Sequence, residues 1–299
     1  MFKYWGFGLL IESEIEFPEL LPFRFDAPDL TIRLDKTPET LTGQNVVHRV
    51  RVSMSQNEYL LKFLNVANYY AANGNEIIVE RLQDADDKSL RLFLLSNAIA
   101  AILHQRNGIP LHASGIFHKD GVVLFCGNSG SGKSTIISAF RQKGYKVFTD
   151  DVCVLQKLPD GTISVVPSYP MIKLWKDSYE KQGLAMTSEE SRIRPQLPKY
   201  GNFFHEVFDV TPQTVKQFFI LESNNLVSGV QIKVLSSLQA FAEIQKNSYR
   251  PVQMNVMQKR DIHFEMISTL IKGIPVYKTQ RQANVNTIAE LVASIESKL

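Results

Sequence analysis

Residues 127–134 (GNSGSGKS) have the types and spacing of a phosphate-binding loop, G-x-x-x-x-G-K-[ST]. Its glycines leave room for successive backbone N–H groups to point at phosphate oxygens. Lys133 would neutralise charge on the β- and γ-phosphates, and the Ser134 hydroxyl would ligate Mg²⁺. The pattern therefore predicts nucleotide binding, with ATP and Mg²⁺ as the expected ligands. The candidate binding residues are Gly127, Asn128, Ser129, Gly130, Ser131, Gly132, Lys133, Ser134 and Thr135.

Two adjacent carboxylates, Asp150 and Asp151, follow closely after this loop. Residues 145–149 read as a short strand, which would place both carboxylates beside the loop. One carboxylate can hold Mg²⁺ together with Ser134, while the other accepts a proton from an attacking hydroxyl. The sequence does not say which Asp does which, and the alternative is a simple polar turn after a strand.

His112 is the third candidate for chemistry. Residues 111–117 alternate as a strand does, and residues 118–121 read as a hairpin turn. If Phe117 pairs with Val122, counting back along the hairpin sets His112 opposite Gly127, at the mouth of the loop. There it would position or polarise the Asp pair. The alternative is a structural histidine.

Residues 185–205 are polar, contain two prolines and a glycine, and have weak periodicity, which predicts a mobile segment. Phosphoryl transfer needs cations near the γ-phosphate, and loops commonly supply them. Arg192, Arg194 and Lys199 are available, and Lys199 is predicted to be the catalytic cation. Ordinary solvated charges are the alternative for each.

The elements around these residues predict an α/β protein. Residues 122–126 are an apolar strand, residues 135–143 have a helical apolar face, and Gly144 would end that helix. Residues 1–85 read as a small β-rich part, a scaffold or a peptide-docking surface, and residues 86–299 as the nucleotide-binding domain. Expected strands are 4–11, 30–34, 48–53, 59–63, 66–72, 76–80, 164–166, 171–175, 215–222 and 274–278; expected helices are 89–105, 177–183, 236–247, 256–272 and a last one capped by Asn286 or Thr287.

Composition narrows the class further. The 299 residues carry a net charge of +3 with mixed signs, which gives no argument for nucleic acid or a membrane anchor. The cysteines, Cys126 and Cys153, fall in predicted strands and are typical of buried thiols in a reducing compartment. No segment has the length and apolarity of a membrane span. We therefore expect a cytoplasmic protein.

Three segments, LHASG, GNSGSGKS and GYKVFTDD, resemble the catalytic domain of HPr kinase/phosphorylase, whose fold is similar to that of phosphoenolpyruvate carboxykinase. The resemblance covers about residues 108–156. It implies that His112, residues 127–134 and the pair Asp150/Asp151 occupy site positions, with Ser134 a metal ligand. A Glu-x-Arg-Gly signature that HPr kinases carry after the Asp pair has no counterpart. Instead, the opening WGFGLLIESEIEFPEL and the segment PSYPMIKLW resemble shorter HPr-kinase-like proteins of lasso-peptide gene clusters.

These proteins are similar to kinases that phosphorylate a serine of a precursor peptide. The sequence thus predicts an ATP- and Mg²⁺-dependent kinase acting on a serine hydroxyl of a peptide or small protein, and leaves a homo-oligomer open. The alternatives are an HPr(Ser) kinase, a kinase of small molecules, and a nucleotide-gated binding protein that transfers nothing.

Overall fold

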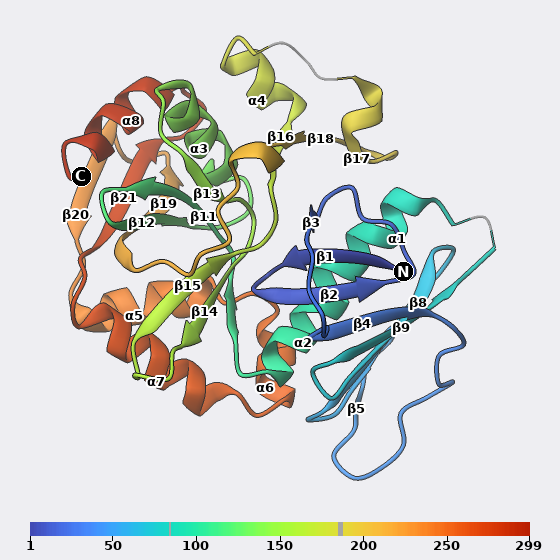
Figure 1. Ribbon diagram of the computed structural model, residues 1–299. Coiled ribbons are helices and arrows are strands. Elements are labelled where there is room, and N and C mark those ends of the chain that lie inside the picture. Colours follow the sequence, from blue (N-terminus) through green and yellow to red (C-terminus); the bar gives the residue numbers. More distant parts are fainter. Residues whose placement is uncertain (84, 185–187) are drawn as a thin grey trace.

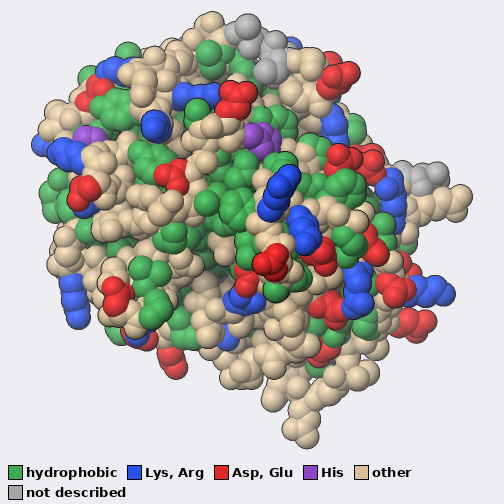
Figure 2. Space-filling model, viewed as in Figure 1, with side chains coloured by type: hydrophobic (Ala, Val, Ile, Leu, Met, Phe, Trp, Pro, Cys, Tyr) green, Lys and Arg blue, Asp and Glu red, His purple; other side chains and the backbone are tan. Residues whose placement is uncertain are grey.

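The computed structural model describes residues 1–83, 85–184 and 188–299 and has a mixed α/β fold (Figure 1). Figure 2 shows hydrophobic side chains gathered in the middle of the viewed face, with acidic and basic side chains mixed toward its right-hand side. No helix in the described residues is long and apolar enough to cross a membrane.

The N-terminal part forms one sheet, called here the N-terminal sheet, with nine strands in the described residues, in the order β3-β1-β2-β4-β9-β8-β7-β6-β5. Its strands are β1 Phe2–Gly6, β2 Leu9–Ser13, β3 Leu21–Pro22, β4 Leu30–Leu34, β5 Val47–His48, β6 Val52–Met54, β7 Glu58–Phe63, β8 Ala67–Ala72 and β9 Glu76–Arg81. Asn73 and Gly74 adopt positive φ in the turn between β8 and β9.

A long helical segment covers this sheet, as the apolar pattern of residues 89–105 predicts. It consists of α1 (Asp87–Phe93), a π-helical turn (Leu94–Ala98) and α2 (Ile99–Gln105). The Asp86 side chain caps its first turn by accepting from Ser89 N at 2.8 Å. Its buried side chains share one core with the strands before it and with Val152, Val154 and Tyr169. The domain boundary at residue 85 stays a prediction. The helix follows this boundary in the sequence but packs on the N-terminal sheet that precedes it.

A second sheet, the central sheet, has the order β13-β11-β12-β19-β21-β20 within the described ranges. Its strands are β11 Ala113–His118, β12 Gly121–Cys126, β13 Val147–Thr149, β19 Val215–Asn224, β20 Val230–Val234 and β21 Val276–Gln282. β12, β19 and β21 are parallel neighbours, so their carboxyl ends lie at one edge of the sheet. The predicted pairing of Phe117 with Val122 is confirmed.

Helices cover both faces of the central sheet because its strands are apolar on both sides. Alternate residues of β12 face opposite layers: Val123 and Phe125 pack with α3 (Lys133–Gln142) and α8 (Ile288–Glu296). Val122 and Leu124 pack with α5 (Ser237–Lys246) and α7 (Arg260–Ile271). Figure 1 shows these two helix layers on opposite sides of the sheet.

Two smaller sheets complete the described fold. The middle sheet, β10-β14-β15, contains Ile109–Leu111, Cys153–Lys157 and Ile163–Pro167. The outer sheet, β16-β18-β17, contains Met171–Trp175, Leu197–Phe203 and Arg192–Arg194, with α4 (Lys176–Lys181) after β16. Both predicted cysteines are buried and unpaired in their strands.

Several predicted elements were wrong in their bounds. Residues 4–11 form a hairpin, because Phe7 and Gly8 adopt positive φ between β1 and β2. Residues 48–53 are also two strands, with Arg49 and Val52 pairing around a tight turn. The expected helix 256–272 starts only at residue 260, as α7, because the left-handed Gln258 separates it from α6 (Pro251–Val256), which was not predicted. In each case a turn interrupts an apolar pattern that reads as continuous.

Other strands were missed or shortened because they are polar. β21 runs on to Gln282 rather than ending at residue 278, and the exposed edge strand β20 was not predicted. Residues 185–187 of the predicted mobile segment lie outside the described residues. The rest of that segment carries β17 and β18, whose Pro198 and Gly201 hide the strand signal.

Candidate active site

The candidate residues lie where the chain passes from the middle sheet to the central sheet. Residue 112 separates β10 from β11, and residues 150–152 separate β13 from β14. The two breaks are aligned, because Leu111 pairs with Cys153 on one side and Gly115 with Thr149 on the other. His112, Asp150 and Asp151 are therefore released from regular strand pairing at one place, which we call the seam.

The glycine-rich loop follows β12 at the carboxyl edge of the central sheet. Gly127, Gly130 and Gly132 have φ of +144°, +82° and +105°, a region that side chains rarely adopt. A Cβ at Gly127 would lie 2.4 Å from the carbonyl oxygen of Leu221, so no side chain fits there. The loop leads directly into α3 at Lys133. The last backbone N–H groups of the loop therefore lie at the start of a helix, where anions are favoured.

Lys133 is buried and turned back over the loop. Its Nζ donates to the carbonyl oxygens of Gly127 at 2.7 Å and Asn128 at 3.2 Å. Burial lowers the pKa of Lys133 below its ordinary value, and nearby Asp151 and Asp150 act in the opposite direction. The ammonium group thus sits over the loop with backbone oxygens as its hydrogen-bond acceptors.

Asp150 is almost completely buried and accepts hydrogen bonds at both oxygens. Its Oδ1 accepts from the Ser134 hydroxyl at 2.9 Å and from the Ser114 hydroxyl at 2.6 Å. Its Oδ2 accepts from the backbone N–H of Lys173 at 2.8 Å. These bonds fix the carboxylate against the first turn of α3.

Asp151 faces the opposite way, with its backbone in a left-handed conformation at φ +73°. Its Oδ2 accepts from Lys173 Nζ at 2.7 Å, and its Oδ1 lies 3.5 Å from His112 Nδ1. His112 Nδ1 also donates to the Asp151 carbonyl oxygen at 2.8 Å, which assigns the proton to that ring nitrogen. Lys173 therefore binds both acids, Asp150 through its backbone and Asp151 through its side chain.

The charges in this cluster shift one another. Burial by itself raises the pKa of Asp151, but Lys173, Lys199 and His112 hold it well below its ordinary value. Burial and Lys133 lower the pKa of His112. Lys173 has a raised pKa despite its burial, because it faces Asp151 and Tyr169. The arrangement favours an ionised Asp151 at neutral pH.

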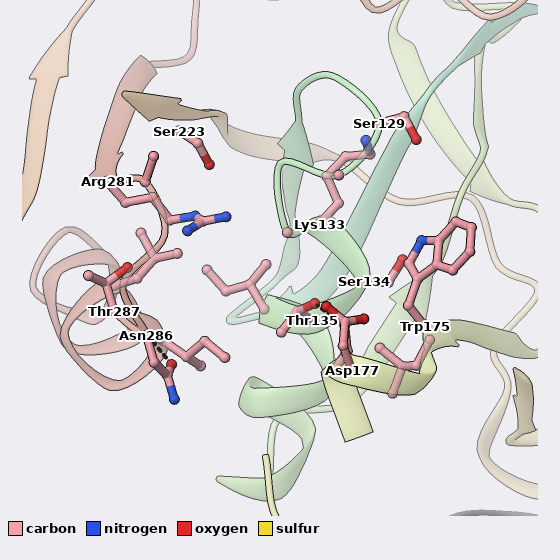
Figure 3. Close-up of a pocket in the computed structure, with 18 of the residues that line it drawn as sticks. Ser129, Lys133, Ser134, Thr135, Trp175, Asp177, Ser223, Arg281, Asn286 and Thr287 are labelled. Carbon is pink, nitrogen blue, oxygen red and sulfur yellow. Dashed lines mark hydrogen bonds between the residues drawn. The ribbon is translucent and has the colours of Figure 1, made fainter. Parts of the chain in front are cut away.

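A cavity of about 840 Å³ opens beside the loop and is lined by most of the predicted site (Figure 3). The predicted residues that line it are His112, Ser129, Gly130, Gly132, Lys133, Ser134, Thr135, Asp151 and Lys199. The other predicted residues, Gly127, Asn128, Ser131 and Asp150, do not line the cavity. Lys199 lies with its Nζ 5.7 Å from the Trp175 ring centre, on paired strands of the outer sheet.

The other two cations of the predicted mobile segment lie elsewhere. Arg192 bonds with Glu189 and Tyr200, and Arg194 stacks on Phe93. Trp175 lines the cavity and is 40% exposed, whereas Tyr169 is buried.

Four further residues at the site were not identified from the sequence. Lys173 and Ser114 bind the two acids, Arg281 reaches the loop at Ser131, and Asn247 anchors the loop. The Asn247 Oδ1 accepts from the Gly127 N–H at 2.7 Å, and its carbonyl oxygen accepts from the His112 N–H at 2.7 Å. No sequence spacing links Asn247 to the loop. Only the position of Lys173, in the segment PSYPMIKLW, carried any signal.

Comparisons with known proteins add little to this geometry. No protein-family model and no curated protein matches the chain. Among solved structures it is similar to the Hpr(Ser) kinase/phosphatase from Coxiella burnetii, with 13% identity over 63% of this chain and 89% of that one, at a TM-score of 0.28. A likeness at this level carries no argument about function. The function is therefore argued from the residues of the site.

Proposed function

We propose that this protein is an ATP- and Mg²⁺-dependent kinase that transfers the γ-phosphate to a serine hydroxyl of a peptide. The observation that carries the proposal is one cavity lined together by the glycine-rich loop, Lys133, Ser134 and the ionised Asp151. Phosphate ligands, a metal site and a proton acceptor are thus available to the same bound substrate.

The residues present fit a magnesium ion. Ser134 and Asp150 offer a hydroxyl and a carboxylate oxygen already 2.9 Å apart, which is the hard-oxygen donor set that Mg²⁺ prefers. Ser134 and Asp150 would hold the ion beside the bound phosphates. When bound, Mg²⁺ neutralises part of the charge on the phosphates.

The loop and Lys133 would bind the phosphates. Backbone N–H groups of residues 130–135 are available at the start of α3, where the helix dipole also favours anions. Lys133 would exchange its present acceptors, the carbonyls of Gly127 and Asn128, for phosphate oxygens. Lys199, which lines the cavity from β18, would add positive charge near the transferred group.

Asp151 would accept the proton of the serine hydroxyl. As that O–H bond breaks, the serine oxygen forms a bond to the γ-phosphorus and the bond to the ADP oxygen breaks. His112 and Lys173 hold Asp151 in place from two sides, through contacts at 3.5 Å and 2.7 Å. Asp150 lies against Ser134 and does not line the cavity, so we assign it to the metal and Asp151 to the acceptor.

The finer features of the proposal rest on the sequence resemblance. We take the peptide substrate to be a ribosomally made precursor of the lasso type, with HPr as the alternative acceptor. The N-terminal sheet is then a scaffold or a docking surface for that peptide. A strand added at an edge of the sheet would be one way to dock it.

The test is mass spectrometry of candidate acceptors after incubation with the protein, ATP and Mg²⁺. A gain of one phosphate on a precursor peptide supports the proposal, provided that Lys133→Ala and Asp151→Asn abolish it. Lys233→Ala and Asp261→Asn, both at exposed positions, are the matched controls and should keep full activity. Labelling of HPr alone would assign the other substrate. ATP binding with no transfer to any acceptor would leave a nucleotide-gated binding protein.

A further inference from the structure

The cavity extends well past the loop, toward the end of β21 and the start of α8. This second half is lined by Arg281, residues 283–287, Ile288 and Leu291. Figure 3 shows Arg281, Asn286 and Thr287 on one side of α3 and Trp175 on the other. None of the groups assigned to phosphoryl transfer lies in this half.

The order of the strands fixes the direction of a bound nucleotide. Asp151 and His112 lie at the ends of β13 and β11, on one side of β12 and its loop. Arg281 lies on β21, on the other side of β12, with β19 between. A triphosphate whose γ-phosphate reaches Asp151 and whose chain follows the loop can extend its remaining atoms into the half of the cavity at β21 and α8.

Arg281 is a cation placed without a counter-charge. Among the described residues it forms no ion pair, and burial lowers the pKa of its guanidinium. Its Nε lies 3.5 Å from the Ser131 carbonyl oxygen, and its guanidinium is 3.9 Å from where a Cβ of Gly132 would be. Figure 3 shows the guanidinium pointing from β21 toward the loop. An anion leaving the loop on this side would meet it.

Beyond Arg281 the wall is apolar with a few polar groups. Ile136, Ile288 and Leu291 belong to one core and expose part of their surface to the cavity. The Oδ1 of the exposed Asn286 accepts a hydrogen bond from the Ile288 N–H at 3.3 Å, and the amide NH₂ of Asn286 has no partner in the described ranges. Apolar walls with a few polar groups suit a planar aromatic ligand.

We infer that this half of the cavity, from Arg281 to the first turn of α8, is a nucleoside subsite for the sugar and base of the bound triphosphate. Arg281 contacts the α-phosphate and sugar, the Ile136–Ile288 wall packs on the base, and the Asn286 amide bonds to the edge of the base. The inference rests on the proposed function for the direction of the nucleotide. It makes the donor a nucleoside triphosphate and excludes a bare polyphosphate.

The test is a calorimetric binding series on the full chain with Mg²⁺, using ATP, ADP, GTP, CTP and inorganic triphosphate. We expect ATP to bind at least about tenfold more tightly than triphosphate, the size of one or two good contacts. Asn286→Ala should reduce that ratio with little change for triphosphate. Arg281→Met should weaken ATP and ADP by similar factors. Asn225→Ala, at an exposed position in the β19–β20 loop, is the control.

Three results would overturn the inference. One is equal binding of ATP and triphosphate, which leaves the kinase proposal standing with no subsite for the base. The second is a loss confined to ATP in Arg281→Met, which would place Arg281 at the γ-phosphate. The third is no binding of any nucleotide, with Lys133→Ala indistinguishable from the wild type, which removes the proposed function as well. Discrimination among ATP, GTP and CTP that disappears in Asn286→Ala supports the assigned contact with the base.

Discussion

Replacing Lys173 by Met should strongly destabilise the fold, because it leaves the Asp151 carboxylate without its closest cation. The Lys173 side chain is 4% exposed and that of Asp151 is 24% exposed, with Nζ and Oδ2 2.7 Å apart. Breaking a fully buried pair from one side costs about 3–5 kcal/mol. Since Asp151 keeps some contact with water and with His112, we expect a loss of roughly 2–3 kcal/mol at pH 7.

The loss should depend on pH in a definite direction. In the wild type, the pKa of Asp151 lies below the ~3.9 of an unfolded Asp, so its contribution is complete above about pH 4 and is lost only below it. Without Lys173 only Lys199 and His112 oppose the effect of burial, and we expect burial to prevail and raise the folded pKa of Asp151 above the unfolded value. The folded variant then gains protons as the pH falls, so its deficit relative to wild type should narrow between pH 7 and pH 4.5.

Urea unfolding at pH 7 and 4.5 measures both effects. The double variant Lys173→Met/Asp151→Asn should recover about 2 kcal/mol of the loss, because the unpaired charge is then gone. Lys233→Met, at an exposed position on β20, should stay within about 0.5 kcal/mol of wild type. A single-variant loss below about 1 kcal/mol, or losses that simply add in the double variant, would refute the reasoning.

Two further predictions concern the loop and the core. Gly127→Ala should lower the free energy of unfolding in urea by at least about 2 kcal/mol and abolish ATP binding, because φ is +144° and the new Cβ would meet the Leu221 carbonyl. The control Gly273→Ala, whose Cβ would enter open space, should be neutral. Burial lowers the pKa of His104 to about 4, so the unfolded chain binds more protons than the folded chain between pH 6.5 and 4. The free energy of unfolding should therefore decrease as the pH is lowered through that window, by up to roughly 3 kcal/mol. His104→Gln should flatten that slope in urea unfolding at a series of pH values, and an unchanged slope would assign it to other groups.

Local sequence signals were sufficient for the hairpin and the loop. The turn at residues 118–121 set the pairing of Phe117 with Val122, and the structure has that register. The strand, loop and helix around residues 127–134 follow from an apolar run, the glycines and the helical face of α3. In these places the contacts that decide the structure are close in sequence.

Contacts between distant residues could not be predicted in this way. Lys173 reaches Asp151, Asn247 reaches Gly127, and Arg281 reaches Ser131 only through the tertiary fold. Each of these side chains reads as an ordinary polar residue in its own segment. The charge of Lys199 was noticed, but its strand was not, since pairing with β16 outweighs its weak local propensity.

The seam has a mechanical consequence. Both strands of a continuous two-stranded ribbon, β10–β11 and β14–β13, lose their regular pairing at the level of His112 and Asp151. Val152, at the end of the break, and Val154, just beyond it, are packed into the core of the N-terminal sheet. Because the ribbon lacks ladder hydrogen bonds at the seam, a rotation of that sheet against the central sheet is accommodated there at the least cost in pairing. A chain docked on the N-terminal sheet that rotates this sheet would therefore change the distances between His112, Asp151 and the loop before it changes other parts of the site.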